Sequence, residues 1–408
     1  MSDDTNETTG LTRRDFIRVG ATSAAGIALT GLGALNASAA ESPGKLPRRR
    51  YGRTGLEISA LVGASDWNPA VIPMAVEAGV NYWHKAHRWT SPQDLPAAIK
   101  KQPREAYYLE VTVDRVGGDH MRGRIDEEQH YQFVKQCVER SGVGYYDVFK
   151  FHFGYHSVEE AKTDMGMIRC YERLMKEGVV KHLAISQHHY NNIGGDMAYD
   201  IVAYLIDHSP YEAAQFFYTY GDKKELDEVL ALAKRKDFGT IAMKTMGGVG
   251  RAAEDKKFQA LLAEPRFNGS TPGAAMVKWL MSNPNLTAAV IATRNFTQLK
   301  ENLGAARQSV LGYNDRETLG LLAAYNKGLT CLLCADCVSR CPEHIAIADI
   351  LRCERYALDY HELSRARAEY STLTKDGSAC IACGNCMPAC KADIDIVSKL
   401  KEVHNLLG

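Results

Sequence analysis

Two copies of one cysteine spacing constrain this 408-residue chain more than any other feature. Nine of its eleven cysteines lie between Cys331 and Cys390. Eight of these form two C-x₂-C-x₂-C-x₃-C motifs, and such a loop presents three thiolates to three irons of one cube. In two-cluster ferredoxins the fourth cysteine binds the other cluster. The spacing therefore predicts two [4Fe–4S] clusters, one held by Cys331, Cys334, Cys337 and Cys390, the other by Cys380, Cys383, Cys386 and Cys341.

Disulfide bonds and zinc sites are the two alternatives for these cysteines. An exported chain could form disulfides, and zinc sites also use cysteine, although they favour paired C-x₂-C knuckles or histidines over a triple-cysteine loop. The segment between the motifs, residues 347–373, has a strongly helical pattern. Residues 313–408 are therefore predicted to form an α-helical ferredoxin-type domain, with Cys353 as a spare thiol packed on its helix.

The first forty residues have the features of an export signal. Residues 12–18, TRRDFIR, resemble the twin-arginine signal, and an apolar stretch rich in Gly and Ala runs to an A-x-A cleavage site at residues 37–39. A transmembrane anchor is the alternative, but the stretch is short and weakly apolar beside the ~20 strongly apolar residues that a span needs. We expect residues 1–40 to be a twin-arginine signal peptide cleaved near Ala39, and residues 41–49 to be a linker. The twin-arginine machinery, which moves folded proteins, would export the chain to the periplasm.

From about residue 50 to residue 307 the chain alternates short β-rich runs with amphipathic helical runs. Eight β-α units over ~250 residues are typical of a closed (β/α)₈ TIM barrel. A doubly wound open sheet is the rival, but no G-x-G-x-x-G follows the first strand. The predicted strands cover residues 58–65, 81–86, 106–113, 147–154, 180–186, 213–219, 239–245 and 287–293.

Several stretches of this region are similar to aldo/keto reductases. RRRYGRTGLEISAL resembles the N-terminal hairpin and first strand of that family. GVNYW, YYDVFKFHF, KEGVVKHLAIS, IAMKTMGG and VKWLMSNPNLTAAVIATRNFTQLKENL follow in the family's order and spacing. The resemblance covers roughly residues 48–307, and the cysteine-rich end matches the iron–sulfur branch of the family. It implies an oxidoreductase with a barrel over residues 50–312.

The resemblance also implies where the catalytic residues lie. In aldo/keto reductases an Asp, a Tyr, a Lys and a His meet at the C-terminal ends of the strands, and the Tyr protonates the carbonyl while NADPH donates hydride. The Asp falls on His84, the Tyr on Trp89 and the Lys on Thr112. Only the His is retained, as His152. Trp has no acidic proton near neutral pH and Thr cannot stabilise a tyrosinate. Lys85 is a candidate replacement, although strand alternation points it away from His84.

Contacts to a nicotinamide cofactor are implied in the same way. Ala292 and Gln298 stand where many members hold the 2′-phosphate with a basic residue, and Arg294 is a candidate replacement. NAD(P)H is therefore an alternative cofactor, which an exported protein would meet rarely. Ser186, Gln215 and Tyr218 match family positions beside the nicotinamide, and Tyr218 matches the aromatic residue that stacks on it. Glu301 and Asn302 match positions beside the adenine.

Histidines gather where three of the predicted strands end. Convergent imidazoles can bind a metal or relay protons to a substrate; alternatively each is a surface residue or is bonded to the backbone. SQHHY also resembles the Ser-x-His of the iron–sulfur branch, which makes His188 a candidate pocket residue. The six histidines are His84, His87, His152, His156, His188 and His189.

These features predict an exported iron–sulfur oxidoreductase. Its clusters would pass electrons between a redox protein, or a membrane electron-transfer subunit, and a small molecule at the barrel face. His84 and His152 would supply protons there, and Trp89 would form a wall. One alternative is an NAD(P)H-dependent carbonyl reductase rebuilt around Lys85 and His152, and another is a non-catalytic electron-transfer subunit. Lys+Arg and Asp+Glu are equal, at 49 each, so nothing indicates a nucleic-acid partner.

Overall fold

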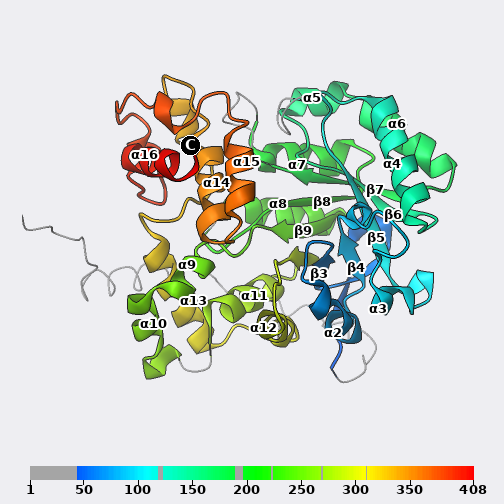
Figure 1. The fold of residues 1–408 in the computed structure, drawn as a ribbon, viewed down its shortest axis with the longest axis horizontal. Helices are drawn as coiled ribbons and strands as arrows, with labels where there is room; N and C mark the ends of the chain where they lie inside the picture. Colours follow the sequence, from blue (N-terminus) through cyan, green and yellow to red (C-terminus); the bar gives the residue numbers. More distant parts are fainter. Residues whose placement is uncertain (1–43, 118–122, 189–195, 222–223, 268–269, 309) are drawn as a thin grey trace, which may run out of the picture.

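Eight parallel strands close into a barrel in this computed structural model, which describes residues 44–408 apart from 118–122, 189–195, 222–223, 268–269 and 309. The neighbours run β10-β3-β4-β5-β6-β7-β8-β9. All eight predicted strands and the parallel barrel are confirmed (Figure 1). The strands are β3 (Leu61–Ala64), β4 (Tyr82–His84), β5 (Tyr108–Val113), β6 (Tyr146–Phe151), β7 (Val180–Gln187), β8 (Ala213–Phe217), β9 (Gly239–Met243) and β10 (Ala288–Val290).

An antiparallel hairpin closes the N-terminal end of the barrel. It consists of β1 (Arg48–Arg50) and β2 (Glu57–Ser59), and the fully buried Tyr51 ring packs there with apolar strand residues such as Val62 and Val148. Gly239 makes this approach possible, because a Cβ at that position would lie 2.5 Å from Tyr51 Cδ2. With this end filled, a small molecule can enter only from the C-terminal ends of the strands.

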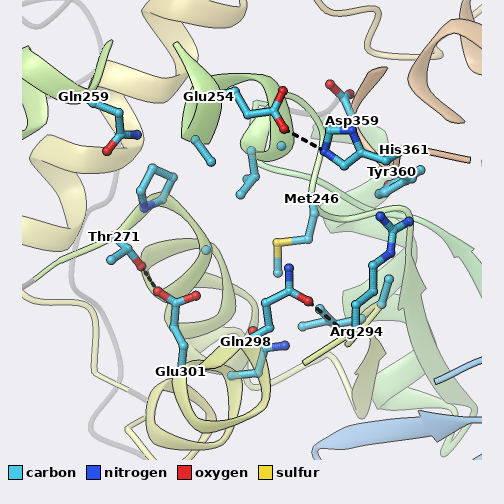
Figure 2. A pocket seen from close by; sticks show the side chains of 18 of the residues that line it. Met246, Glu254, Gln259, Thr271, Arg294, Gln298, Glu301, Asp359, Tyr360 and His361 are labelled. Carbon is cyan, nitrogen blue, oxygen red and sulfur yellow. Dashed lines mark hydrogen bonds and ion pairs between the residues drawn. The ribbon is translucent and has the colours of Figure 1, made fainter. Parts of the chain in front are cut away.

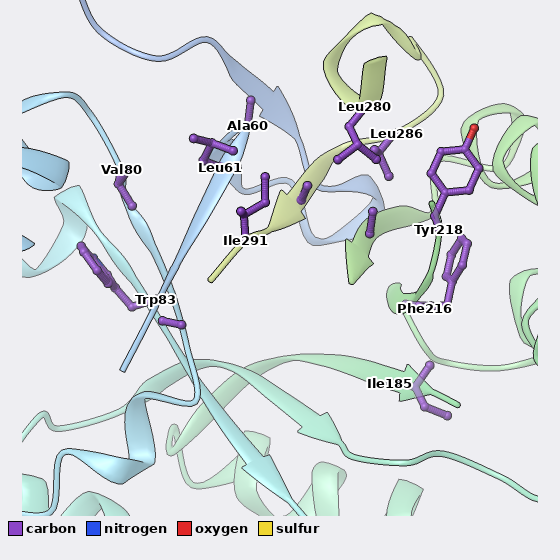
Figure 3. Close-up of a cluster of buried hydrophobic side chains, with 14 of the residues drawn as sticks. Ala60, Leu61, Val80, Trp83, Ile185, Phe216, Tyr218, Leu280, Leu286 and Ile291 are labelled. Atoms are coloured by element: carbon purple, nitrogen blue, oxygen red, sulfur yellow. The ribbon is translucent and has the colours of Figure 1, made fainter. Parts of the chain in front are cut away.

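Amphipathic helices cover the outside of the barrel because the strands also carry apolar side chains on that face. Trp83 and Phe216 are outward residues of this kind, and Figure 3 shows them among buried side chains between strands and helices. Side-chain caps start several helices; for example, Asp126 accepts the Gln129 N–H. The principal helices are α4 (Glu127–Ser141), α6 (Gly166–Lys176), α7 (Ala198–His208), α8 (Lys224–Arg235), α11 (Pro272–Ser282), α12 (Phe296–Ala306) and α13 (Tyr313–Asn326).

The cysteine-rich tail, which we define as residues 327–408, has a core of its own. It contains α14 (Ile347–Leu358), α15 (Leu363–Tyr370) and α16 (Ile396–Leu407). The segment between the motifs is helical as predicted, and Cys353 is fully buried on α14. By contrast α13, predicted as part of the C-terminal domain, packs with the barrel through Leu319 and Leu322. The compact cysteine-rich unit therefore begins after α13.

The two cysteine loops have the same backbone form. Leu333 and Ala335 adopt positive φ values of 57° and 59°, and Ala382 and Gly384 follow with 55° and 76°. Each loop leads into a single 3₁₀ turn and then into a helix of twelve residues, α14 or α16. The repeat in the sequence is thus a repeat in structure.

The predicted signal peptide and its cleavage site near Ala39 lie outside the described residues. Within the described part of the chain, no helix is long and apolar enough to cross a membrane.

Candidate functional site

A cavity of about 140 Å³ lies where the C-terminal ends of the barrel strands face the tail. This is the end at which (β/α)₈ enzymes carry their active sites. The tail supplies one wall, so the cavity exists only because the two parts of the chain are packed together. The barrel side includes Trp67, His84, Lys85, His152, His188, Gln215 and Lys244, and the tail side is formed by Tyr356, Tyr360, Glu362 and Arg365.

Three residues that line this cavity have an unusual backbone. Lys85, Phe153 and Lys244 adopt φ values of 54°, 62° and 54°. Each comes within two residues of a strand end, at β4, β6 and β9. A positive φ costs a non-glycine residue of order 1–3 kcal/mol, and such strain gathers at functional sites. The strained turns direct these three side chains into the cavity.

A buried ion pair supports the cavity from inside the barrel. Lys150 Nζ lies 2.8 Å from Glu110 Oε1, and both side chains are 0% exposed. His84 Nδ1 is 2.8 Å from each of them. Lys150 also donates to Gln215 Oε1 at 2.7 Å, and Thr112 Oγ1 donates to Glu110 at 2.8 Å. His84 and Gln215, both predicted site residues, are thus joined by a pair that the sequence pattern did not predict.

The position of this pair explains why it was not predicted. Strand alternation places Glu110 and Thr112 on one face of β5, and the β5–β6 register sets Thr112 beside Lys150. A charge within the apolar runs YLEVTV and YDVFKF was the available signal, because charges are almost never fully buried unless they are paired. Lys150, not the predicted Lys85, is the cation beside His84, since Lys85 points toward the cavity from its strained turn.

The charges of this network hold His84 neutral. Burial and the charge of Lys150 lower the pKa of His84 to about 4, against the opposing effect of Glu110. Burial alone would raise the pKa of Glu110, but the charges of Lys150 and His84 outweigh it, and the pKa lies well below its usual value. His84 Nδ1 can donate to Glu110 or accept from Lys150, and this choice decides whether Nε2 accepts or donates a proton. The arrangement is suited to proton transfer at His84.

His152 and His188 complete a group of three imidazoles at the cavity. The two rings lie 5.3 Å apart, and Phe153 stacks on His188 with centroids 4.3 Å apart. Asp114 bonds His152 Nδ1 and fixes its ring. Burial, then the charge of Lys85, lowers the pKa of His152 to about 3. Burial, then the charge of Lys244, lowers the pKa of His188 well below its usual value.

The other rim histidines do not join this group. His87 Nδ1 accepts the Thr112 N–H at 3.1 Å, His156 lies 3.4 Å from Glu160, and neither lines the cavity. His189 lies outside the described residues. Over the described ranges, no three His, Cys, Asp or Glu side chains come close enough to hold one metal ion. His84, His152 and His188 are therefore the rim histidines that line the cavity.

Two predicted aromatic contacts are wrong. Trp89 packs on Trp83, with centroids 6.0 Å apart, and the tryptophan that lines the cavity is Trp67. Tyr218 stacks on Trp279 of α11 at 4.9 Å, and its hydroxyl donates to Asp227. The physical reason for Tyr218 is strand alternation, which turns it to the opposite face from Gln215. Ser186 is fully buried, 3.5 Å from His188 Nε2.

A second cavity, of about 460 Å³, lies on the α12 side of the first (Figure 2). Glu301 and Asn302, the predicted adenine contacts, line it together with Arg294 and Gln298. Arg294 is bonded to Glu362 of the tail at 3.2 Å. These residues fit the adenosine end of a nicotinamide cofactor. Tyr218, the residue expected to stack on a nicotinamide, lines neither cavity.

The tail also binds the loop after β9. The carboxylate of Asp359 accepts the Gly248 N–H at 3.2 Å and pairs with Arg251 at 2.6 Å. A Cβ on Gly250 would lie 2.2 Å from the Asp359 carbonyl oxygen, so glycine is required for this contact. The carboxylate of Asp359 therefore occupies the position at the N-terminus of α9 (Val249–Glu254) where a helix favours an anion.

Thiols of the two cysteine motifs lie near one another. Burial raises the pKa of Cys331 to about 12, and the neighbouring thiols that raise it further are Cys334 and Cys390. For Cys386, burial raises the pKa, and the thiols of Cys341, Cys380 and Cys383 add to it. The two motifs therefore lie close enough for their thiols to influence one another, and the crossed assignment stays a prediction.

Backbone N–H groups point at these sulfurs. Leu333 N–H lies 3.2 Å from Cys331 Sγ, and Ile394 N–H lies 3.3 Å from Cys390 Sγ. Backbone that alternates right- and left-handed residues turns its N–H groups into an anion-binding concavity, as at many iron–sulfur sites. A cube binds each thiolate through a different iron, so its ligands need not share one ion. The cysteine set therefore fits two [4Fe–4S] clusters.

The first cysteine loop touches the barrel beside the cavity. Leu333 packs with Phe217 and Met243, and Cys331 lies against the same cluster. Arg355 bonds the carbonyl oxygens of Cys331 and Lys244, at 3.5 and 3.1 Å. The second loop lies further out, with Cys383 exposed and Ile381 60% exposed. The first loop therefore contacts the barrel, whereas the second loop is exposed at the surface.

Comparison with known proteins assigns the barrel. Residues 66–314 match the model of the aldo/keto reductase family, which is more than half of the chain, and the chain therefore belongs to this family. No curated protein matches it. Among solved structures, it is similar to two Pseudomonas aeruginosa proteins assigned to the aldo-keto reductases. They share 14% and 16% identity, cover 64% of this chain and 94% and 95% of their own, and have TM-scores of 0.46 and 0.48.

Proposed function

We propose that this member of the aldo/keto reductase family is an exported oxidoreductase that uses two [4Fe–4S] clusters in place of a nicotinamide. The clusters would supply one-electron transfer between an external redox partner and a small molecule in the 140 Å³ cavity. Cys331, Cys334, Cys337 and Cys390 would hold one cluster, and Cys380, Cys383, Cys386 and Cys341 the other.

One observation carries this proposal: the tail that has the cysteine motifs is also a wall of the cavity. Leu333, which lies between two cysteines of the first loop, packs directly on the barrel residue Phe217. The exposed second loop suits contact with a redox protein. If the tail only stored iron, the packing of Leu333 on Phe217 would not be needed.

The cavity residues would handle protons and orientation. His84 would exchange a proton with the substrate at Nε2, with Lys150 and Glu110 setting its tautomer. His152, oriented by Asp114, is a second proton site. Tyr360 and Arg365 of the tail would exclude water from this side.

The test is single-turnover oxidation. The protein is reduced chemically under anaerobic conditions and mixed with small aldehydes and 2-oxo acids, and the return of the visible absorbance of the oxidised clusters is followed. His84→Gln and His152→Gln should slow this step by about a hundredfold or more. His156→Gln, which changes a rim histidine outside the cavity, should leave the rate unchanged. Equal rates in all three variants would refute the proton roles, and no oxidation by any compound would favour the electron-transfer subunit.

Carbonyl reduction with NAD(P)H is the second candidate, and the 460 Å³ cavity with Glu301 and Asn302 favours it. Titration with NADPH, followed by tryptophan fluorescence, separates the two, because Trp67 lines the neighbouring 140 Å³ cavity. We expect no saturable change, and saturation at micromolar NADPH would favour this candidate.

Export rests on the N-terminal sequence alone. Replacement of Arg13 and Arg14 by lysine should keep the protein in the cytoplasm, as measured by cell fractionation.

A further inference from the structure

Lys244 is a half-buried lysine that the proposed proton chemistry does not use. It follows β9 at the C-terminal face of the barrel and lines the cavity. Its Nζ is buried and has no hydrogen-bond partner among the described residues. The aromatic rings of Phe217 and Tyr356 face this nitrogen, at 4.4 and 5.5 Å from their centroids.

A comparison with Lys150 shows how unusual this is. The Nζ atoms of both lysines are buried in the barrel, but Lys150 has Glu110 at 2.8 Å and Gln215 at 2.7 Å. No carboxylate of the described residues pairs with Lys244. A buried ammonium without a partner is costly, and a lysine in this position loses its proton instead.

Most of the charged groups around Lys244 also favour loss of its proton. Burial, followed by the charge of Arg352, holds the pKa of Lys244 well below its usual value; Arg365 and Arg355 add to this, and Glu369 opposes it. Glu369 is already engaged by Arg365 at 2.9 Å and by Arg352 at 3.5 Å. A neutral lysine amine in an apolar pocket among cations is a nucleophile for carbonyl carbon.

We propose that Lys244 forms an imine with a small carbonyl compound in the cavity. The nitrogen lone pair attacks the carbonyl carbon, a C–N bond forms, and the C–O bond breaks. Both amine hydrogens leave with the oxygen as water, so the step needs no oxidant or reductant. Arg365 and Lys85, on the same cavity, would attract the carboxylate of a 2-oxo acid. This inference rests on the proposed function only in taking the cavity as the substrate site.

The test is reductive trapping in the full-length, oxidised protein. The protein is incubated anaerobically at pH 7 with pyruvate, or with acetaldehyde as an uncharged probe, and with sodium cyanoborohydride. Peptide mapping by mass spectrometry then locates the adduct. We expect Lys244 to be labelled on the order of tenfold or more above any other lysine, since each unit of lowered pKa raises the amine fraction tenfold. Preference for pyruvate over acetaldehyde would identify a 2-oxo acid.

Two lysines serve as internal controls in the same experiment. Lys150, which is buried but paired, should stay unlabelled, and the exposed Lys224 gives the background. Lys244→Arg removes the primary amine and should abolish the adduct, whereas Lys224→Arg, at an exposed lysine outside the cavity, should keep it. Labelling of Lys244 at the level of Lys224 would overturn the inference, and this wild-type result stands even if a variant fails to fold. Trapping needs no electrons from the clusters, because cyanoborohydride supplies the hydride, so it fails or succeeds independently of cluster oxidation.

Discussion

In the cysteine-rich tail the residues that matter are close together in the sequence, whereas at the barrel rim they come from several strands and from the tail. The tail contains two copies of one loop, with left-handed backbone at corresponding residues such as Leu333 and Ala382. The rim instead depends on the pairing of Glu110 with Lys150 across two neighbouring strands. A local spacing therefore indicates the tail chemistry, but only the register of the sheet shows how the rim is held together.

The first test of this comparison concerns the crossed binding of the clusters by the two motifs. We expect cysteine substitutions there to have the largest effect. Cys390→Ser should remove the same cluster as Cys334→Ser, although Cys390 belongs to the other motif. Cys341→Ser should instead remove the cluster that Cys383→Ser removes. Each variant should lose about half of its iron, and EPR spectra of the reduced proteins should fall into these two pairs. Pairing within each motif would contradict the crossed assignment.

The buried ion pair of the barrel should give the next largest effect. Glu110→Gln leaves Lys150 as an uncompensated buried charge, and should lower the free energy of unfolding by about 3–5 kcal/mol. The double variant Glu110→Gln, Lys150→Met removes both charges and should be less destabilised than Glu110→Gln or Lys150→Met alone. Urea unfolding of the four proteins measures this coupling. Additive losses would mean that the two side chains do not act as a pair.

The titration of His130, a buried histidine of α4, should give the smallest effect, again in the barrel. Burial lowers the pKa of His130 to about 4, while an unfolded histidine titrates near 6.5. Below 6.5 the unfolded chain binds a proton that the folded chain excludes, so stability is full above that pH and falls toward pH 4. We expect a loss of about 2 kcal/mol from His130 between pH 7 and pH 4.5. His130→Leu should remove that part of the pH dependence in urea unfolding, and an unchanged slope would contradict it.

The sequence predicted the barrel strands because apolar runs separated by amphipathic helices are local patterns. It also placed His84, His152 and His188 at one face, because parallel strands bring their C-terminal ends together. The contacts of Trp89 and Tyr218 were wrong, since a family pattern does not fix which way a side chain turns after a strand ends. Tyr218 shows this most clearly, because it lies three positions after Gln215, and strand alternation turns it to the other face.

Tail residues at the cavity could not be predicted in the same way. Tyr356, Tyr360 and Arg365 lie far along the chain from the strands that they cover. Their placement follows from the docking of Asp359 on Gly248 and Arg251, which is a long-range contact without a local pattern. The unpartnered state of Lys244 Nζ likewise depends on which carboxylates reach it, and only the folded structure decides that.

Metal analysis of the anaerobically purified protein tests the central claim most directly. Iron and acid-labile sulfide are measured per chain, and EPR spectra are recorded before and after reduction with dithionite. Two [4Fe–4S] clusters require about eight iron and about eight sulfide, with signals that appear on reduction. Zinc without sulfide, or cysteines paired as disulfides in the purified protein, would contradict the account.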